Sequence, residues 1–137
     1  MKQYEKILIE NCLEKANKAL QDAYSNMDVS LSVAQNRAYY AIFYIVLALG
    51  YIDGFTTGKH HQLMGWFNKK YVYQDKVFDS SLAKIYNTLM INREKSDCDV
   101  TQNPVRADVI KDIDSAKVFI ETVMSYIHKR VYEIKDN

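Results

Sequence analysis

The chain is poor in residues that interrupt or cross-link a fold, with 4 glycines, 1 proline and 2 cysteines among 137 residues. So few breakers leave room for long regular elements, and no strand-like alternation bounded by hairpin turns occurs. The cysteines, Cys12 and Cys98, stand far apart and form no CxxC pair, which argues against a zinc site and a disulfide framework. We therefore expect no metal and no cofactor.

Neither sign of charge dominates, since 18 Lys and Arg residues face 17 Asp and Glu residues. A nearly neutral chain lacks the basic field that tight, non-specific DNA binding requires. The longest apolar run, residues 38–49, is shorter than the ~18 residues of a membrane span. The charged first residues lack the apolar segment of a signal peptide. With 48% hydrophobic residues, we expect one cytoplasmic globular domain over residues 1–137, without membrane contact.

Apolar residues recur at spacings of three and four along most of the chain, which predicts α-helices. The last helix follows Pro104, with Asn103 expected as its N-cap. Gly50, Gly54 and Gly58 cluster and predict a loop after the second helix. The predicted helices span about 3–24, 28 or 30 to 49, 60–71, 80–97 and the segment after 104. Four long helices and one short helix indicate an all-α, up-and-down antiparallel bundle.

A charged run, residues 92–99, follows the apolar pattern of the fourth predicted helix. Arg93 and Asp97 are four residues apart, so they share a helical face and can pair. This pair is either an exposed ion pair contributing about 0.5 kcal/mol or part of a polar pocket in which Arg93 contacts a phosphate bidentately. Cys98 lies ~140° from Arg93 on a straight helix. The two can line one pocket only if the helix bends or ends between them.

Arg37 stands where the second predicted helix becomes apolar on all sides. A buried guanidinium needs anionic or carbonyl partners, because an unpaired buried charge is very costly. The acidic candidates by pattern are Glu94, Asp97 and Asp99. Alternatively, Arg37 lies at the solvent edge and only its stem covers apolar surface.

A small basic group surrounds the third predicted helix and consists of Lys59, His60, His61, Lys69 and Lys70. Adjacent histidines on a helix face different ways, so His60 and His61 make a poor pair of metal ligands. We expect them at the surface or in contact with the preceding loop.

Several segments together resemble the prokaryotic HEPN domain (higher eukaryotes and prokaryotes nucleotide-binding). They are Ser32–Tyr44 with Arg37, then Lys59-His60, then Phe67, and then Arg93–Asp97, in matching order over roughly residues 3–128. The resemblance implies a helical bundle, usually a homodimer, and a minimal nucleotidyltransferase as a frequent partner. In many such pairs the HEPN protein is a metal-independent endoribonuclease toxin.

The family's ribonuclease motif is an arginine, a polar residue, several residues and a histidine. Arg93 matches the arginine and Glu94 the polar residue, but Cys98 stands where the histidine falls. The tyrosine two residues beyond that histidine, which some partners modify with AMP, is replaced by Val100. Both differences weaken the prediction of a ribonuclease.

Three functions follow from these patterns. The first is a HEPN-like module that binds a nucleotide, RNA or a nucleotidyltransferase through a polar cleft around Arg93. The second is the endoribonuclease toxin, with Arg93 and Cys98 as catalytic candidates. The third is a purely structural, dimerising bundle. The expected ligand-binding residues are Arg37, Lys59, Arg93, Glu94, Asp97 and Asp99.

Overall fold

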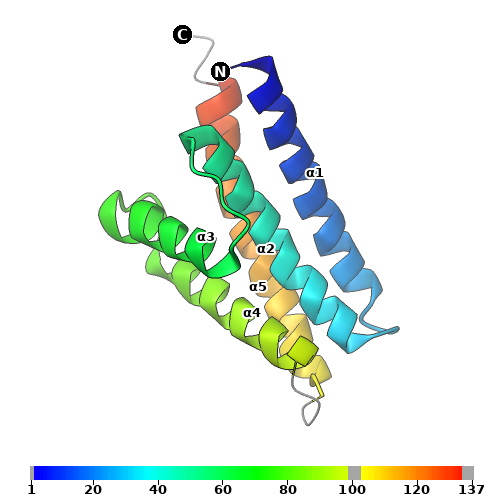
Figure 1. Ribbon diagram of the computed structural model, residues 1–137. Helices are drawn as coiled ribbons and strands as arrows, with labels where there is room; N and C mark the ends of the chain where they lie inside the picture. The colour runs from blue at the N-terminus through cyan, green and yellow to red at the C-terminus, as the bar shows by residue number, and fades with distance from the viewer. Residues whose placement is uncertain (1, 99–102, 134–137) are drawn as a thin grey trace.

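The computed structural model describes residues 2–98 and 103–133, and the structural statements below concern these residues. The α-helices are α1 (Gln3–Ser25), α2 (Leu31–Asp53), α3 (His60–Phe67), α4 (Ser80–Cys98) and α5 (Arg106–His128). Two π-helical segments, η1 (Asn68–Gln74) and η2 (Lys129–Glu133), extend α3 and α5. Four long helices with antiparallel contacts and one short helix confirm the predicted all-α bundle (Figure 1).

The central helix is α2, which packs against α1, α3, α4 and α5. It carries buried small residues, Ala34, Ala38 and Ala41, and α1, which packs against it, carries buried Ala16, Ala19 and Ala23. The helix begins at a capped end, where the Ser30 hydroxyl accepts a hydrogen bond from the Val33 amide at 3.3 Å. In Figure 1, α1, α2 and α5 run side by side, with α4 and α3 on the other side of α2.

The predicted loop at the three glycines was partly wrong, because α2 continues through Gly50 to Asp53. Gly54 ends the helix in the left-handed conformation, with φ of 75°. A Cβ atom on Gly50 would lie 2.4 Å from the carbonyl oxygen of Phe55. Gly50 is therefore a packing position inside the helix, where the chain after Gly54 folds back onto α2.

The start of the last helix also differs from the prediction. α5 begins at Arg106 with Val105 in the N-cap position and no side-chain cap, so the prediction of Asn103 as N-cap was wrong. Arg106 instead joins this end of α5 to the turn after α1, because its guanidinium donates to the Met27 carbonyl at 2.9 Å and pairs with Asp28 at 2.8 Å.

The short helix runs further than the sequence pattern indicated, since η1 carries it from Phe67 to Gln74. The buried rings of this segment pack with aromatic residues of α4 and α5: Phe67 lies 5.7 Å from Tyr86 and 5.3 Å from Phe119 between ring centroids.

No helix in the described part of the chain combines the length and the apolar character of a membrane span.

Candidate functional site

The Arg93 guanidinium lies against the aromatic face of α2. Its central carbon is 4.7 Å from the centroid of the Tyr39 ring and 5.9 Å from that of Tyr40, within the range of cation–π attraction. Only 17% of the side chain is exposed. The fourth helix therefore turns Arg93 into the bundle rather than into solvent.

Arg93 has weak polar compensation for so buried a cation. Asp97, one turn along the same face, lies 3.8 Å from Nη1, which is too long for a hydrogen bond. The Nε atom of Arg93 is buried and has no hydrogen-bond partner among the described residues. Buried polar atoms are almost always paired in folded proteins, so an unpaired donor on a charged group calls for an explanation.

Asp97 is shared with α2, because the Asn36 amide donates to its Oδ2 at 3.1 Å. Asn36 in turn accepts from Arg37 Nε and Nη2 at 3.1 and 2.8 Å. Arg37 is half-buried over the Tyr40 ring, with its central carbon 5.0 Å from the centroid. Among the described residues it pairs with no carboxylate, so the predicted direct contact with Glu94 or Asp97 was wrong. Asn36 stands between Arg37 and Asp97.

His60, the first residue of α3, is bound to the same aromatic cluster. Its Nδ1 lies 2.7 Å from the Tyr39 hydroxyl, and its ring stacks on Phe43 with 4.5 Å between centroids. Burial lowers the pKa of His60, and the Arg93 charge lowers it further. His60 is thus neutral at pH 7, and the prediction of a surface position or a loop contact missed its place between the helices.

Tyr39 connects His60 with Arg93. Its ring is fully buried, and burial raises the pKa of its hydroxyl well above the usual value of 10.0, although the Arg93 charge opposes this rise. The hydroxyl therefore stays protonated at neutral pH and serves as a fixed hydrogen-bonding group. Tyr39, Arg93 and His60 come from α2, α4 and α3, and together we call them the Arg93 site.

The other candidate residues lie on different faces. Glu94 accepts a hydrogen bond at 3.0 Å from His61, whose side chain is 72% exposed. Cys98 is exposed at the end of α4, and because this helix is continuous from Ser80 the ~140° separation from Arg93 remains. Lys59 is exposed at the N-cap position of α3.

One further candidate, Asp99, lies outside the described residues, so the structure places neither it nor its contacts. Within the described chain no group of three or more His, Cys, Asp or Glu side chains is arranged to hold one metal ion.

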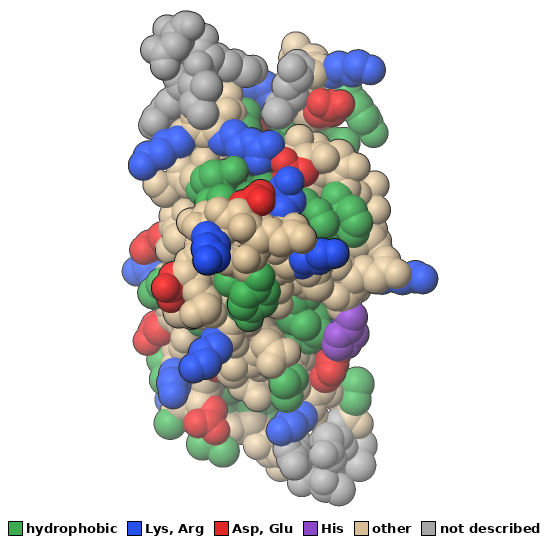
Figure 2. Space-filling view, turned by 90° about the vertical axis from the view of Figure 1, so that its left-hand side faces the viewer, with side chains coloured by type: hydrophobic (Ala, Val, Ile, Leu, Met, Phe, Trp, Pro, Cys, Tyr) green, Lys and Arg blue, Asp and Glu red, His purple; other side chains and the backbone are tan. Residues whose placement is uncertain are grey.

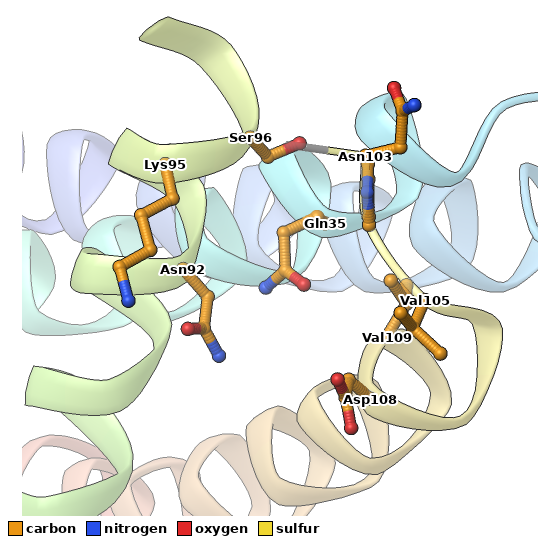
Figure 3. Close-up of a pocket in the computed structure, with 9 residues that line it drawn as sticks. Gln35, Asn92, Lys95, Ser96, Asn103, Val105, Asp108 and Val109 are labelled. Carbon is orange, nitrogen blue, oxygen red and sulfur yellow. The ribbon is translucent and has the colours of Figure 1, made fainter. Parts of the chain in front are cut away.

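A polar pocket lies on the neighbouring face of α4, between α2 and the start of α5 (Figure 3). Its volume is about 250 Å³, and Arg93 is not among its lining residues. Two of its lining residues, Gln35 and Asn92, both donate to Asp112 Oδ2 at 2.8 Å. These bonds compensate the buried Asp112 carboxylate, so this group has a structural role in joining three helices.

The described residues around α3 and α4 form no extended surface field of one charge. Figure 2 shows Lys and Arg interspersed with Asp and Glu and with hydrophobic side chains on this face. The local arrangement at Arg93, rather than a broad basic surface, is therefore the feature that could attract an anion.

The fold and the arginine near the end of α4 define a class of helical bundle with a polar group between α2, α3 and α4. The HEPN domain family matches residues 9–130, and the chain belongs to this family. The chain is also similar to the UPF0332 protein of Thermotoga maritima, at 37% identity over 98 residues, which cover 71% of this chain and 73% of that protein. The resemblance described from the sequence is thereby confirmed.

Proposed function

We propose that this HEPN domain binds a phosphate-bearing ligand, a nucleotide or a short RNA segment, through the guanidinium of Arg93. The observation that carries the proposal is the buried, unpaired Nε of Arg93, together with the 3.8 Å distance to Asp97. A phosphate supplies the negative charge and the acceptor oxygens that this guanidinium lacks among the described residues.

The surroundings of Arg93 favour a short ligand. The aromatic rings of Tyr39 and Tyr40 restrict the guanidinium, so little side-chain freedom is lost on binding. The chain carries a net charge of only +1, which would give long duplex nucleic acid little electrostatic attraction. A nucleotide or a few nucleotides of single-stranded RNA fit this balance better.

The test compares Arg93→Ala with wild type for binding of a fluorescent short oligouridylate, with AMP as an unlabelled competitor. We expect Arg93→Ala to weaken binding at least about tenfold, since charge-assisted hydrogen bonds contribute about 1.5–3 kcal/mol. The far-UV circular dichroism should not change. Arg106→Ala is the matched control, because Arg106 is 60% exposed and pairs with Asp28 away from the site.

Equal affinity of Arg93→Ala and wild type would show that the ligand binds elsewhere. Absence of binding of both probes to wild type would reject the proposal in favour of a partner protein or a structural role. The homodimer and the nucleotidyltransferase partner remain predictions that size measurement and co-purification can address.

A ribonuclease that uses Cys98 has less support from the site, because Cys98 and Arg93 lie on different faces of α4. The same oligouridylate, incubated without metal and resolved on a gel, tests this alternative. Cleavage by wild type that is lost in Cys98→Ala would favour the ribonuclease over a binding module.

A further inference from the structure

His60 has a hydrogen-bonding nitrogen that the proposed function does not use. Nδ1 is bound to the Tyr39 hydroxyl, and the ring is held by stacking on Phe43. Nε2 makes no hydrogen bond with a described residue, and the His60 side chain is half-buried. A fixed imidazole with one open nitrogen is thus placed next to the Arg93 guanidinium.

The charge of Arg93 favours one of the two neutral tautomers of His60. Arg93 lies close enough to the Tyr39 hydroxyl to oppose the rise of its pKa. A cation on one side of this oxygen attracts its lone pairs and directs its hydrogen toward the other side, where His60 Nδ1 lies. Nδ1 then accepts, and the proton of the neutral ring is on Nε2. His60 therefore presents an N–H donor to a ligand.

We infer that His60 is a second ligand-contacting residue of the Arg93 site, and that its Nε2–H donates to an oxygen of the phosphate held by Arg93. This inference rests on the proposed function. Both side chains lie within 6 Å of the same two rings, with 4.7 and 5.9 Å for Arg93 and 5.6 Å for His60 to each of Tyr39 and Tyr40.

The contact makes binding depend on pH. The charged or titratable groups near His60 are Tyr39 and Tyr40 on α2, Arg93 and Glu94 on α4, and His61 on its own helix. Without ligand, burial and Arg93 lower the pKa of His60. A bound phosphate places negative charge beside the ring and raises this pKa, so protonation and binding favour each other. Affinity should therefore increase as the pH falls below neutrality.

The experiment measures binding of a short oligouridylate without a terminal phosphate, from about pH 5 to about pH 8. Its phosphodiesters and uracil rings keep their charge in this range, so a pH effect comes from the protein. We expect wild type to bind more tightly at low pH, by up to about tenfold for each pKa unit that the ligand adds to His60. His60→Gln keeps a donor but cannot titrate, and its affinity should be flat across this range.

His61→Gln is the matched control, because His61 is the adjacent histidine but bonds Glu94 at the surface. It should keep the wild-type pH dependence. As an independent measurement, the nuclear magnetic resonance titration of His60, assigned with His60→Gln, should move to higher pH when the oligonucleotide is bound.

The outcomes separate this inference from the proposed function. If His60→Gln retains the pH dependence of wild type while Arg93→Ala loses binding, His60 does not contact the ligand and the proposed function stands. If Arg93→Ala binds normally, or wild type does not bind, the proposed function is wrong and the inference fails with it.

Discussion

Arg93 and Arg130 both lie against tyrosine rings, one toward each end of α2, and they differ in how completely they are paired. Arg130, on η2, pairs with Asp53 at 2.5 Å and donates to the hydroxyls of Tyr71 and Tyr126 at 2.8 and 3.1 Å. Tyr71 also donates to the other oxygen of Asp53. Arg93 has only the 3.8 Å contact with a carboxylate and an unpaired Nε among the described residues.

The comparison separates a structural arginine from a candidate binding arginine by their partners rather than by their burial. Arg130 is the more exposed of the two, at 35% against 17% for Arg93, yet its acceptors are all supplied by the chain. Such a network fixes the C-terminal end of α2 to η1 and η2. Arg93, whose hydrogen-bond donors are less completely paired, is therefore the arginine that can bind an external anion.

The largest effect is expected from Arg130→Ala. Loss of the guanidinium leaves Asp53, which is 8% exposed, without its ion-pair partner. Breaking a fully buried pair costs about 3–5 kcal/mol, and the partial exposure of Arg130 reduces this to about 2–3 kcal/mol. Urea unfolding should show a lower midpoint with an unchanged slope. A loss no greater than that of Arg106→Ala would contradict the structural role of Arg130.

A smaller effect on stability is expected at the other arginine. Arg93→Met keeps an apolar chain over Tyr39 and removes a poorly compensated charge, and such replacements are often neutral or stabilising. The free energy of unfolding should change by less than about 1 kcal/mol, while binding of the oligouridylate is lost. A loss as large as that of Arg130→Ala would mean that both arginines are structural.

The smallest effect is a difference in how the two ends respond to pH. The pKa of His60 is lowered in the folded state, so the unfolded chain binds more protons and stability is lost as the pH falls below about 6.5. Burial raises the pKa of Tyr71, so its contribution is present below about pH 10 and lost above it.

Urea unfolding at several pH values can separate these two limits. His60→Gln should reduce the acid loss and leave the alkaline loss unchanged. Tyr71→Phe should reduce the alkaline loss and leave the acid loss unchanged. If each substitution changed the acid loss and the alkaline loss of stability equally, the groups at the two ends of α2 would not titrate independently.

The helices could be predicted from the sequence because their apolar spacing follows from which residues are buried. Val109, Ile113 and Val123 belong to the apolar pattern of the last helix, and all three are in the core. The helix ends were less predictable. In the sequence alone, Gly50 indicates a loop. Its place inside a helix is explained only by the tertiary contact with the Phe55 carbonyl, which the sequence does not reveal.

The site was only partly accessible from the sequence. Arg93 and Asp97 could be placed on one face because their spacing is local. The contact between Tyr39 and His60 could not be predicted, because it joins two residues that lie 21 positions apart, on different helices. The one available signal was the pair Lys59-His60, which contributed to the family resemblance but gave no partner or direction for the imidazole.

Gly50 also bears on how a substitution remote from the Arg93 site could alter it. The chain from Gly54 to Lys59 runs back along α2 and ends where His60 meets Tyr39 (Figure 1). Along α2, Gly50 and Tyr39 are eleven residues apart, or about 16 Å. A methyl group at residue 50 would displace the connection where the Phe55 carbonyl meets α2. The imidazole of His60, at the other end of this connection, would then be shifted away from its position beside the Tyr39 hydroxyl.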